Sequence, residues 1–368
     1  MLKVGQPSPI IHNTTLADAP GLVELMQVGL RSEWNEAFVA WKYFDNPAGR
    51  VYGRCAELEG RTVAIYGNIP LRLKVAGKTF TAAQAVDAVV AKELRRHGLF
   101  ITLSRQTSQE MDEAGVVLTY ALPNSVSQAG VLGPLAWSSV GSIPRYVKLL
   151  DRDAVSKTTG RTGPSRWLSD AILRAASLAS AVRTREPRDE GIRVEEVSAF
   201  DERVDHLWEK AAAEFPIAVV RDCTYLNWRY VQNPLGSYTI LAAMRLDQLV
   251  GFAVLGWRDM QSRGAVAIVE FLVEPGDAQA GRALLQDITA RGRQAKASQL
   301  QCWMLRHHAF YRRLLEQSGF LYWPSRFVPG LLRYTTPFVI RERPYNALPC
   351  NPQVLGNWYV TMGDHDYY

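Results

Sequence analysis

The sequence has no long apolar segment. Its 368 residues contain no uninterrupted stretch of apolar residues long enough to cross a bilayer, and the N-terminal residues lack the apolar core of a secretory signal. These absences argue against a membrane-spanning or exported protein, so we expect a cytoplasmic one. Hydrophobic residues make up 47% and charged residues 21%, a balance typical of globular proteins, and the length suits two domains.

Cysteine and histidine are also scarce. The 4 cysteines are Cys55, Cys223, Cys302 and Cys350, and none of them forms the C-x-x-C spacing of a zinc site or redox pair. Among the 6 histidines, only His307 and His308 are adjacent. We therefore predict reduced thiols and no metal site.

The basic charge is concentrated in one segment. The net charge is +6, but between Lys157 and Arg188 seven basic residues face two acidic ones. The rest of the chain lacks the broad basic surface that nucleic acids require, so we expect no nucleic-acid partner. Trp167 and Ile172 in this segment predict an amphipathic helix that packs across the domains. Peripheral contact with an anionic membrane is the alternative.

One motif occurs twice. The segment Trp41–Gly49 reads WKYFDNPAG, and WRYVQNPLG follows 187 residues later at Trp228–Gly236. After a short deletion the register continues, because Asp87 aligns with Glu270 and Gly98 with Gly281. Several landmarks in one register indicate an internal duplication.

Each copy has the same predicted order of elements. A helix is followed by a hairpin of strands, a strand rich in β-branched residues, a long helix and further strands, which favours a mixed α/β sheet. We expect domains at 1–150 and 192–335, joined by a basic linker at 151–191 and followed by an extension at 336–368.

A resemblance to a known family follows from one copy. The segment RRHGLF after a strand, then a long helix, a strand, Pro123-Asn124 and Ala136-Trp137, resembles the core of the GNAT superfamily of acyl-CoA-dependent N-acyltransferases. The resemblance implies two tandem GNAT-like α/β domains, each a mixed, mostly antiparallel sheet flanked by helices. The repeated tryptophan motif is similar to bacterial members associated with polysaccharide and amino-sugar pathways.

The first copy contains the expected donor site. Backbone N–H groups at a helix N-terminus, next to a glycine and basic side chains, suit the pyrophosphate of acetyl-CoA. The residues assigned to the donor are Val89, Arg95, Arg96, His97, Gly98, Leu99, Phe100 and Asn124. In the second copy Asp277 places a negative charge where phosphates would lie, so we expect that copy to be degenerate.

The resemblance also implies catalytic groups. A carboxylate near the donor strand acts as general base in many members, and Asp87 and Glu270 occupy that place. Asp87 as a purely structural carboxylate is the alternative. Many members place a tyrosine on a short helix to protonate the departing thiolate, and the corresponding positions here hold Leu132 and Leu315. Tyr120 and Tyr146 are therefore the candidates for this general acid. Tyr311 lies one helical turn before Leu315.

We therefore expect an enzyme that moves an acetyl or related acyl group from acyl-CoA to a small-molecule primary amine by direct attack. An amino sugar or polysaccharide precursor is the narrower expectation for the acceptor. Two alternatives stay open: a Fem-like aminoacyl or other acyl transferase, and a catalytically degenerate binding or scaffold protein. For the C-terminal Asp364-His365-Asp366 we expect aromatic packing and contacts with substrate, not a metal site.

Overall fold

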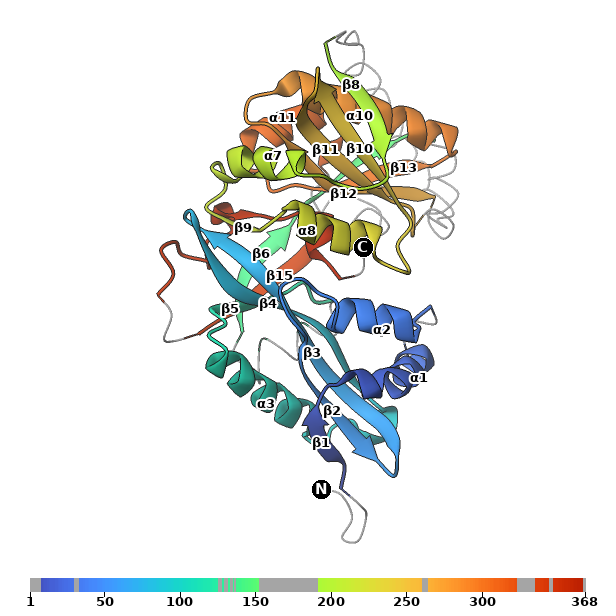
Figure 1. Cartoon of the computed structure of the whole chain (residues 1–368), viewed down its shortest axis with the longest axis vertical. Helices are drawn as coiled ribbons and strands as arrows, with labels where there is room; N and C mark the ends of the chain where they lie inside the picture. Colours follow the sequence, from blue (N-terminus) through green and yellow to red (C-terminus); the bar gives the residue numbers. More distant parts are fainter. Residues whose placement is uncertain are drawn as a thin grey trace, which may run out of the picture. The chain divides into compact units, whose positions relative to one another are not determined.

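The chain folds into two compact units (Figure 1). The computed structural model describes residues 8–29, 33–124, 128, 132, 135, 137–151, 191–259, 264–322, 335–343 and 347–366. Unit 1 consists of Met1–Gly141, Thr224–Leu235 and Pro337–Leu355. Unit 2 consists of Ser142–Cys223, Gly236–Thr336 and Gly356–Tyr368.

Unit 1 is built on a sheet with the strand order β1-β2-β3-β4-β5-β15-β6. The strands are β1 (Ile10–Asn13), β2 (Tyr52–Leu58), β3 (Arg61–Val75), β4 (Lys78–Val90), β5 (Leu118–Ala121), β6 (Ser138–Ile143) and β15 (Thr336–Glu342). β4 and β5 pair in parallel, whereas β1 to β4 pair as antiparallel neighbours. The expected mixed, mostly antiparallel sheet is confirmed.

Helices cover both faces of this sheet. They are α1 (Ala19–Gly29), α2 (Glu36–Tyr43) and α3 (Leu99–Glu113). Successive strand residues point to opposite faces, and in β3 the Tyr66 ring contacts Phe100 of α3, whereas Gly67 lies against Tyr43 of α2. Helices α2 and α3 therefore lie on opposite sides of the sheet.

Unit 2 repeats this arrangement around a sheet with the order β14-β7-β13-β12-β11-β10-β8. The strands are β7 (Arg145–Leu149), β8 (Arg193–Val197), β10 (Tyr238–Arg245), β11 (Gln248–Gly256), β12 (Ala265–Val273), β13 (Gln299–Trp303) and β14 (Leu321–Tyr322). The helices that bear on the site are α7 (Arg203–Ala212), α10 (Ala278–Gln294) and α11 (Ala309–Gln317). β12 and β13 form the parallel pair, in the place of β4 and β5.

The last strands of the two halves are exchanged. β7 comes from the first half of the sequence but pairs with β13 of unit 2, with Tyr146 opposite Cys302. β15 comes from the second half but pairs with β5 of unit 1, with Ile340 opposite Tyr120. The compact units are therefore discontinuous and do not coincide with the continuous ranges 1–150 and 192–335 expected from the sequence. The difference arises because each half contributes its last strand to the sheet of the other half.

Both tryptophans of the repeated motif lie within unit 1. Helix α2 begins after Asn35, whose side chain accepts a hydrogen bond from the Phe38 N–H at 2.9 Å, and it carries Trp41. The Trp41 and Trp228 rings stack at 5.0 Å, and each indole Nε1 donates to the backbone carbonyl of the other residue, at 2.8 and 3.1 Å. The two copies of the motif thus pack reciprocally against each other.

The predicted linker helix, with Trp167 and Ile172, lies outside the described residues, as does most of the expected linker 151–191. Among the described helices, none combines the length and hydrophobicity needed to cross a membrane.

Candidate functional site

The two parallel strands of unit 1 separate from each other. β4 and β5 are paired only at Ala83 with Thr119 and Gln84 with Tyr120, although β4 continues to Val90. Past Gln84, β4 remains paired with β3 on its other side, for example Val89 with Ile65. One edge of the Val89 segment is thereby directed away from β3, toward the opening between β4 and β5.

The N-terminus of α3 follows this opening. Gly98 is its N-cap residue, with φ of 81° in the left-handed region, and no side chain caps the helix. The first amide groups of an α-helix have no partner within the helix, so they face outward here. A Cβ at Gly98 would meet no atom within 4 Å, and the loop residues Arg95 to Gly98 are exposed. This helix end has the geometry of an anion-binding site.

The side chains of the loop give it positive charge. Arg95 donates from Nε to the Val90 carbonyl at 3.0 Å, which ties the loop to the end of β4. Arg96 has φ of 67°, an unusual value for a residue with a side chain, and so holds local backbone strain. Leu99 and Phe100 form the first turn of α3, and His97 is exposed beside them.

Asn124 is exposed after the end of β5. Its carbonyl oxygen accepts a hydrogen bond from the Gln128 N–H at 2.9 Å. The amide side chain is therefore on the surface of the segment that follows the parallel pair, as the sequence predicted for a residue after that strand.

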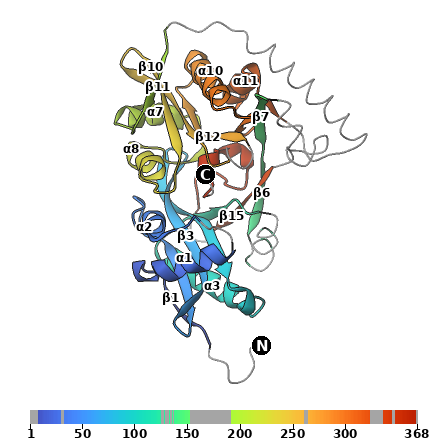
Figure 2. The ribbon, with the colours of Figure 1, turned by 90° about the vertical axis from the view of Figure 1, so that its right-hand side faces the viewer.

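The corresponding helix end of unit 2 is closed by a carboxylate. Asp277 is the N-cap residue of α10, where its side chain accepts from the Ala280 N–H at 3.0 Å and pairs with Arg245 Nη1 at 2.7 Å. A bound anion would meet this negative charge. The alignment of Gly281 with Gly98 is wrong in structural terms, because Gly281 lies inside α10 and a Cβ there would approach Leu314 Cδ1 to 2.5 Å. Helices α10 and α11 lie side by side (Figure 2). Gly281 allows α10 and α11 to pack closely.

The strand opening of unit 2 is filled by side chains from within the unit. β12 is paired with β13 only as far as Ile268. Beyond that point the Tyr359 hydroxyl donates to the Phe271 carbonyl at 2.5 Å, and the Tyr311 hydroxyl accepts from the Val273 N–H at 3.2 Å. Backbone groups that a donor would contact in this copy are therefore already bonded, which agrees with a degenerate second copy.

Asp87 of β4 is enclosed by partners in unit 1. Its Oδ2 accepts from Lys42 Nζ at 2.6 Å and from the Tyr43 hydroxyl at 2.7 Å, and its side chain is only 4% exposed. The Lys42 ammonium also lies 5.1 Å from the centre of the Trp34 ring. Both short bonds are made to the same oxygen of a buried carboxylate, so the contacts favour the structural alternative for Asp87 over the general base.

Glu270 of β12 belongs to a buried ionic cluster in unit 2. Its Oε2 accepts from Arg221 Nε at 2.9 Å and from the Thr361 hydroxyl at 3.1 Å. Arg221 Nη2 donates to Asp364 Oδ2 at 2.7 Å. The C-terminal Asp364 thus has an internal ionic role, which the sequence gave no reason to expect. Glu270 and Asp364 both belong to a structural network.

The two tyrosines proposed as acids lie in different units. Tyr120 of β5 is buried against Phe338, with ring centres 5.8 Å apart. Tyr146 of β7 is buried in unit 2, and burial raises the pKa of its hydroxyl to about 12. Tyr311 is on the short helix α11, where the family places its acid, although its hydroxyl is bonded to Val273 in unit 2.

His308 should make the protein sensitive to acid. Burial, followed by the neighbouring His307, lowers the pKa of His308 to about 4. As the pH falls, His308 is protonated in the unfolded chain before it is protonated in the folded chain. The free energy of unfolding therefore decreases as the pH falls from about 6.5 towards 4. We expect His308→Gln to reduce this loss in denaturation midpoints measured across that pH range. The exposed His97→Gln is the control, and an equal effect of both variants would contradict the assignment.

One potential metal-ligating group occurs among the described residues: His12, Asp18 and Cys55, with ligand atoms within 4.8 Å of one another. Asp18 Oδ2 also accepts from the Thr15 N–H at 2.7 Å, and burial raises the pKa of the Cys55 thiol to about 12. His12 Nε2 lies 2.8 Å from Asp18 Oδ1, and Cys55 Sγ lies 3.3 Å from the Thr14 hydroxyl, so all three side chains are engaged in internal hydrogen bonds.

Comparison with known proteins agrees with this geometry. Residues 11–138 match the model of the acetyltransferase (GNAT) domain, whereas no curated protein matches the sequence. A GCN5-related N-acetyltransferase from Anabaena variabilis has a TM-score of 0.61 at 13% identity, with 91% of this chain and 73% of that one covered.

Two further solved structures have the same architecture. N-myristoyltransferase of Saccharomyces cerevisiae with bound myristoyl-CoA has a TM-score of 0.57 at 14% identity, covering 95% of this chain and 83% of that one. A putative acetyltransferase from Pyrococcus horikoshii has a TM-score of 0.54 at 13% identity, covering 100% and 98%. The chain therefore shares the fold of these proteins, and its residues 11–138 match the GNAT acetyltransferase domain.

Proposed function

We propose that the protein is an N-acyltransferase that transfers an acetyl or related acyl group from acyl-CoA to a primary amine, with the donor bound in unit 1. The observation that carries the proposal is the open N-terminus of α3, where Gly98 is left-handed and Arg95 and Arg96 add positive charge. The match of residues 11–138 to the acetyltransferase domain supports the same location. The yeast N-myristoyltransferase that shares the fold was solved with an acyl-CoA, myristoyl-CoA, bound to it.

In this proposal, different residues of unit 1 bind different parts of the donor. The pyrophosphate bonds to the free amides at the start of α3, and the two arginines strengthen those bonds. The backbone around Val89 bonds to the thioester carbonyl in the opening between β4 and β5, and Asn124 bonds to the pantetheine amides. The donor is a substrate, and no metal is required.

The attacking group is an amine that has lost its proton. Asp87 Oδ2 is already engaged by Lys42 and Tyr43, so proton removal by water is the simpler route. Attack of the amine on the thioester carbon forms the amide bond and releases the CoA thiolate, a good leaving group that accepts a proton afterwards. An amino sugar or polysaccharide precursor remains the narrower proposal for the acceptor.

Gly98→Val tests the donor site. We expect it to weaken acetyl-CoA binding at least tenfold in isothermal titration calorimetry, because the new side chain occupies the space where the phosphates approach the amides. Gly77→Val is the matched control, since Gly77 has φ of 82° and an equally open Cβ position, in the turn between β3 and β4. Both variants carry the same backbone strain, and only Gly98→Val should lose the ligand.

The arginines give a second, independent test. The double variant with Arg95→Glu and Arg96→Glu should also lose binding, and the loss should be larger at low ionic strength because it is electrostatic. Equal losses of acetyl-CoA affinity in Gly98→Val and Gly77→Val would show that the donor does not bind at the start of α3. No acetyl-CoA binding by the unaltered protein would overturn the proposed function.

A further inference from the structure

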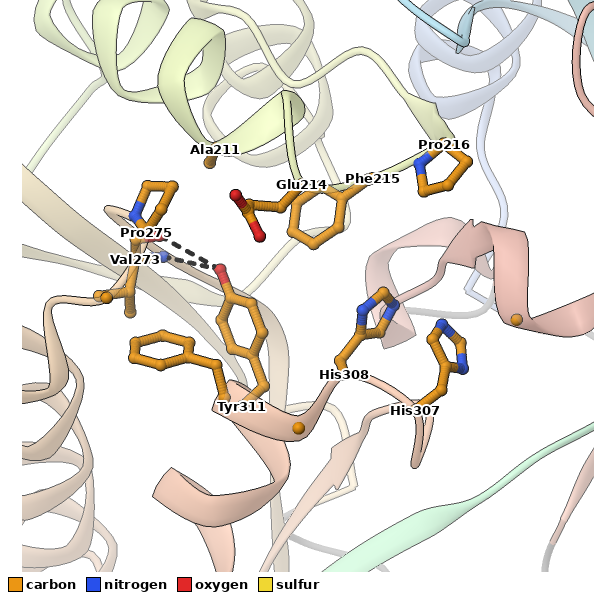
Figure 3. Close-up of a pocket in the computed structure, with 13 residues that line it drawn as sticks. Ala211, Glu214, Phe215, Pro216, Val273, Pro275, His307, His308 and Tyr311 are labelled. Atoms are coloured by element: carbon orange, nitrogen blue, oxygen red, sulfur yellow. Dashed lines mark hydrogen bonds between the residues drawn. The ribbon is translucent and has the colours of Figure 1, made fainter.

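Unit 2 contains a pocket that the proposed donor site does not use. Its volume is 430 Å³, within the range of small-molecule sites. The end of α7, the end of β12, the loop that follows β12 and the start of α11 form its walls (Figure 3). The residues that matter for its chemistry are Glu214, Phe215, His307, His308 and Tyr311.

The pocket has one fixed charge, and that charge is negative. Among the lining residues that the structure describes, Glu214 is the only acidic or basic one apart from the two histidines. No ion pair of its carboxylate is found among the described residues, and nearby Lys210 pairs with Glu274 instead, at 3.0 Å. Burial lowers the pKa values of both histidines, so they are neutral at pH 7. An anionic ligand would therefore be repelled.

The hydrogen-bonding groups of the pocket are mainly acceptors. His308 Nε2 is 2.9 Å from the Trp358 carbonyl oxygen, which can only accept, so Nε2 carries the hydrogen of the neutral ring. Nδ1 is then an acceptor. The Tyr311 hydroxyl is occupied by the Val273 backbone. A ligand that fits here has to supply hydrogen-bond donors.

Aromatic rings form part of the wall, and they are held in place. Phe215 stacks on Tyr359 with ring centres 4.0 Å apart, and it lies 5.3 Å from the His308 ring and 6.2 Å from the Tyr311 ring. The Glu214 carboxylate lies beside the Phe215 ring (Figure 3). An aromatic wall next to a carboxylate suits an organic cation with an apolar part, because the carboxylate pairs with the charge and the wall packs against the apolar part.

We propose that this pocket binds a small primary amine in its ammonium form, with the ammonium on Glu214 and the apolar part of the ligand against the aromatic side of the pocket. The inference rests on the proposed function in taking an amine to be the chemical class that the enzyme acylates. Binding itself requires only residues of unit 2.

The test uses the full-length protein without acyl-CoA. Binding is measured by saturation-transfer NMR for two amines, glucosamine and phenethylamine. Glucose is the uncharged control for glucosamine, and 2-phenylethanol is the uncharged control for phenethylamine, so the comparison separates the effect of the ligand's charge from that of its shape. Glu214→Gln removes the charge and keeps the size of the side chain, and it should weaken amine binding about tenfold or more. Glu209→Gln, an exposed position on α7 that does not line the pocket, is the matched control.

Each outcome decides between the alternatives. Binding of at least one amine that is lost in Glu214→Gln and kept in Glu209→Gln supports the pocket. No amine binding, equal binding of the uncharged controls, or an unchanged affinity in Glu214→Gln overturns it. Acetyl-CoA binding is measured in the same samples, so a protein that binds acetyl-CoA but no amine contradicts the pocket alone. One that binds an amine but no acetyl-CoA contradicts the proposed function alone.

Discussion

Replacing Arg221 with methionine is expected to lower the free energy of unfolding by about 3–5 kcal/mol. Arg221 is fully buried, and its guanidinium group donates to Glu270 at 2.9 Å, to Asp364 at 2.7 Å and to the Val219 carbonyl at 2.8 Å. Methionine has a similar apolar volume but no charge. Two buried carboxylates would then face each other without a cation, which is the costly part of breaking a buried ion pair.

Urea denaturation of the full chain measures this effect. Arg203→Met is the control, because Arg203 forms an exposed pair with Asp201 in the same unit, and exposed pairs contribute about 0–1 kcal/mol. Adding Glu270→Gln to Arg221→Met should recover part of the loss, since it removes one of the two uncompensated charges. A loss below about 1 kcal/mol for Arg221→Met would mean that water reaches the cluster, contrary to its burial.

Local patterns predicted individual elements well. A long helix after the glycine of RRHGLF and a strand rich in β-branched residues were expected, and α3 begins directly after Gly98 while β12 spans Ala265–Val273. The reason is that the signals are local: a glycine directly before the helix and a run of β-branched residues in the strand. The duplication was detectable because the tryptophan motif is preserved in both copies, where its tryptophans stack on each other.

A fixed difference in residue number does not align the two copies correctly where the loop before the long helix differs in length. Residues 91–98 connect β4 to α3, whereas only residues 274–277 connect β12 to α10. Gly281 therefore falls within a helix, although it aligns with the N-cap Gly98. The sequence did contain the correct signal, because Pro-Gly-Asp directly before a helical pattern marks Asp277 as an N-cap.

Other features depend on contacts that no local pattern specifies. The pairing of Arg221 with Glu270 and Asp364 joins residues 49 and 143 positions apart. The exchange of β7 and β15 could not be predicted either, because the sequence pattern of a short apolar strand does not depend on which sheet the strand joins. The pocket near Glu214 is assembled from several separate segments, which is why His307 and His308 could not be placed in it from the sequence.

The strand exchange leads to the second large effect, because residues 1–150 expressed alone should not fold into a soluble monomer. In the full chain the edge of β5 is paired with β15, where Phe338, Val339 and Ile340 are completely buried. Without that strand, β5 presents an apolar edge with unpaired backbone groups, which favours aggregation. Size-exclusion chromatography and circular dichroism report the outcome.

Coexpression of residues 1–151 with residues 191–368 is the matched control. It restores β15 to unit 1 and β7 to unit 2, so the two pieces should purify together, bind acetyl-CoA and elute as one complex. The comparison separates the missing strand from the break in the chain, because both samples end the first piece at nearly the same residue. A soluble, monomeric 1–150 that binds acetyl-CoA by itself would show that β5 does not depend on β15, and the continuous domain boundaries expected from the sequence would then be the correct ones.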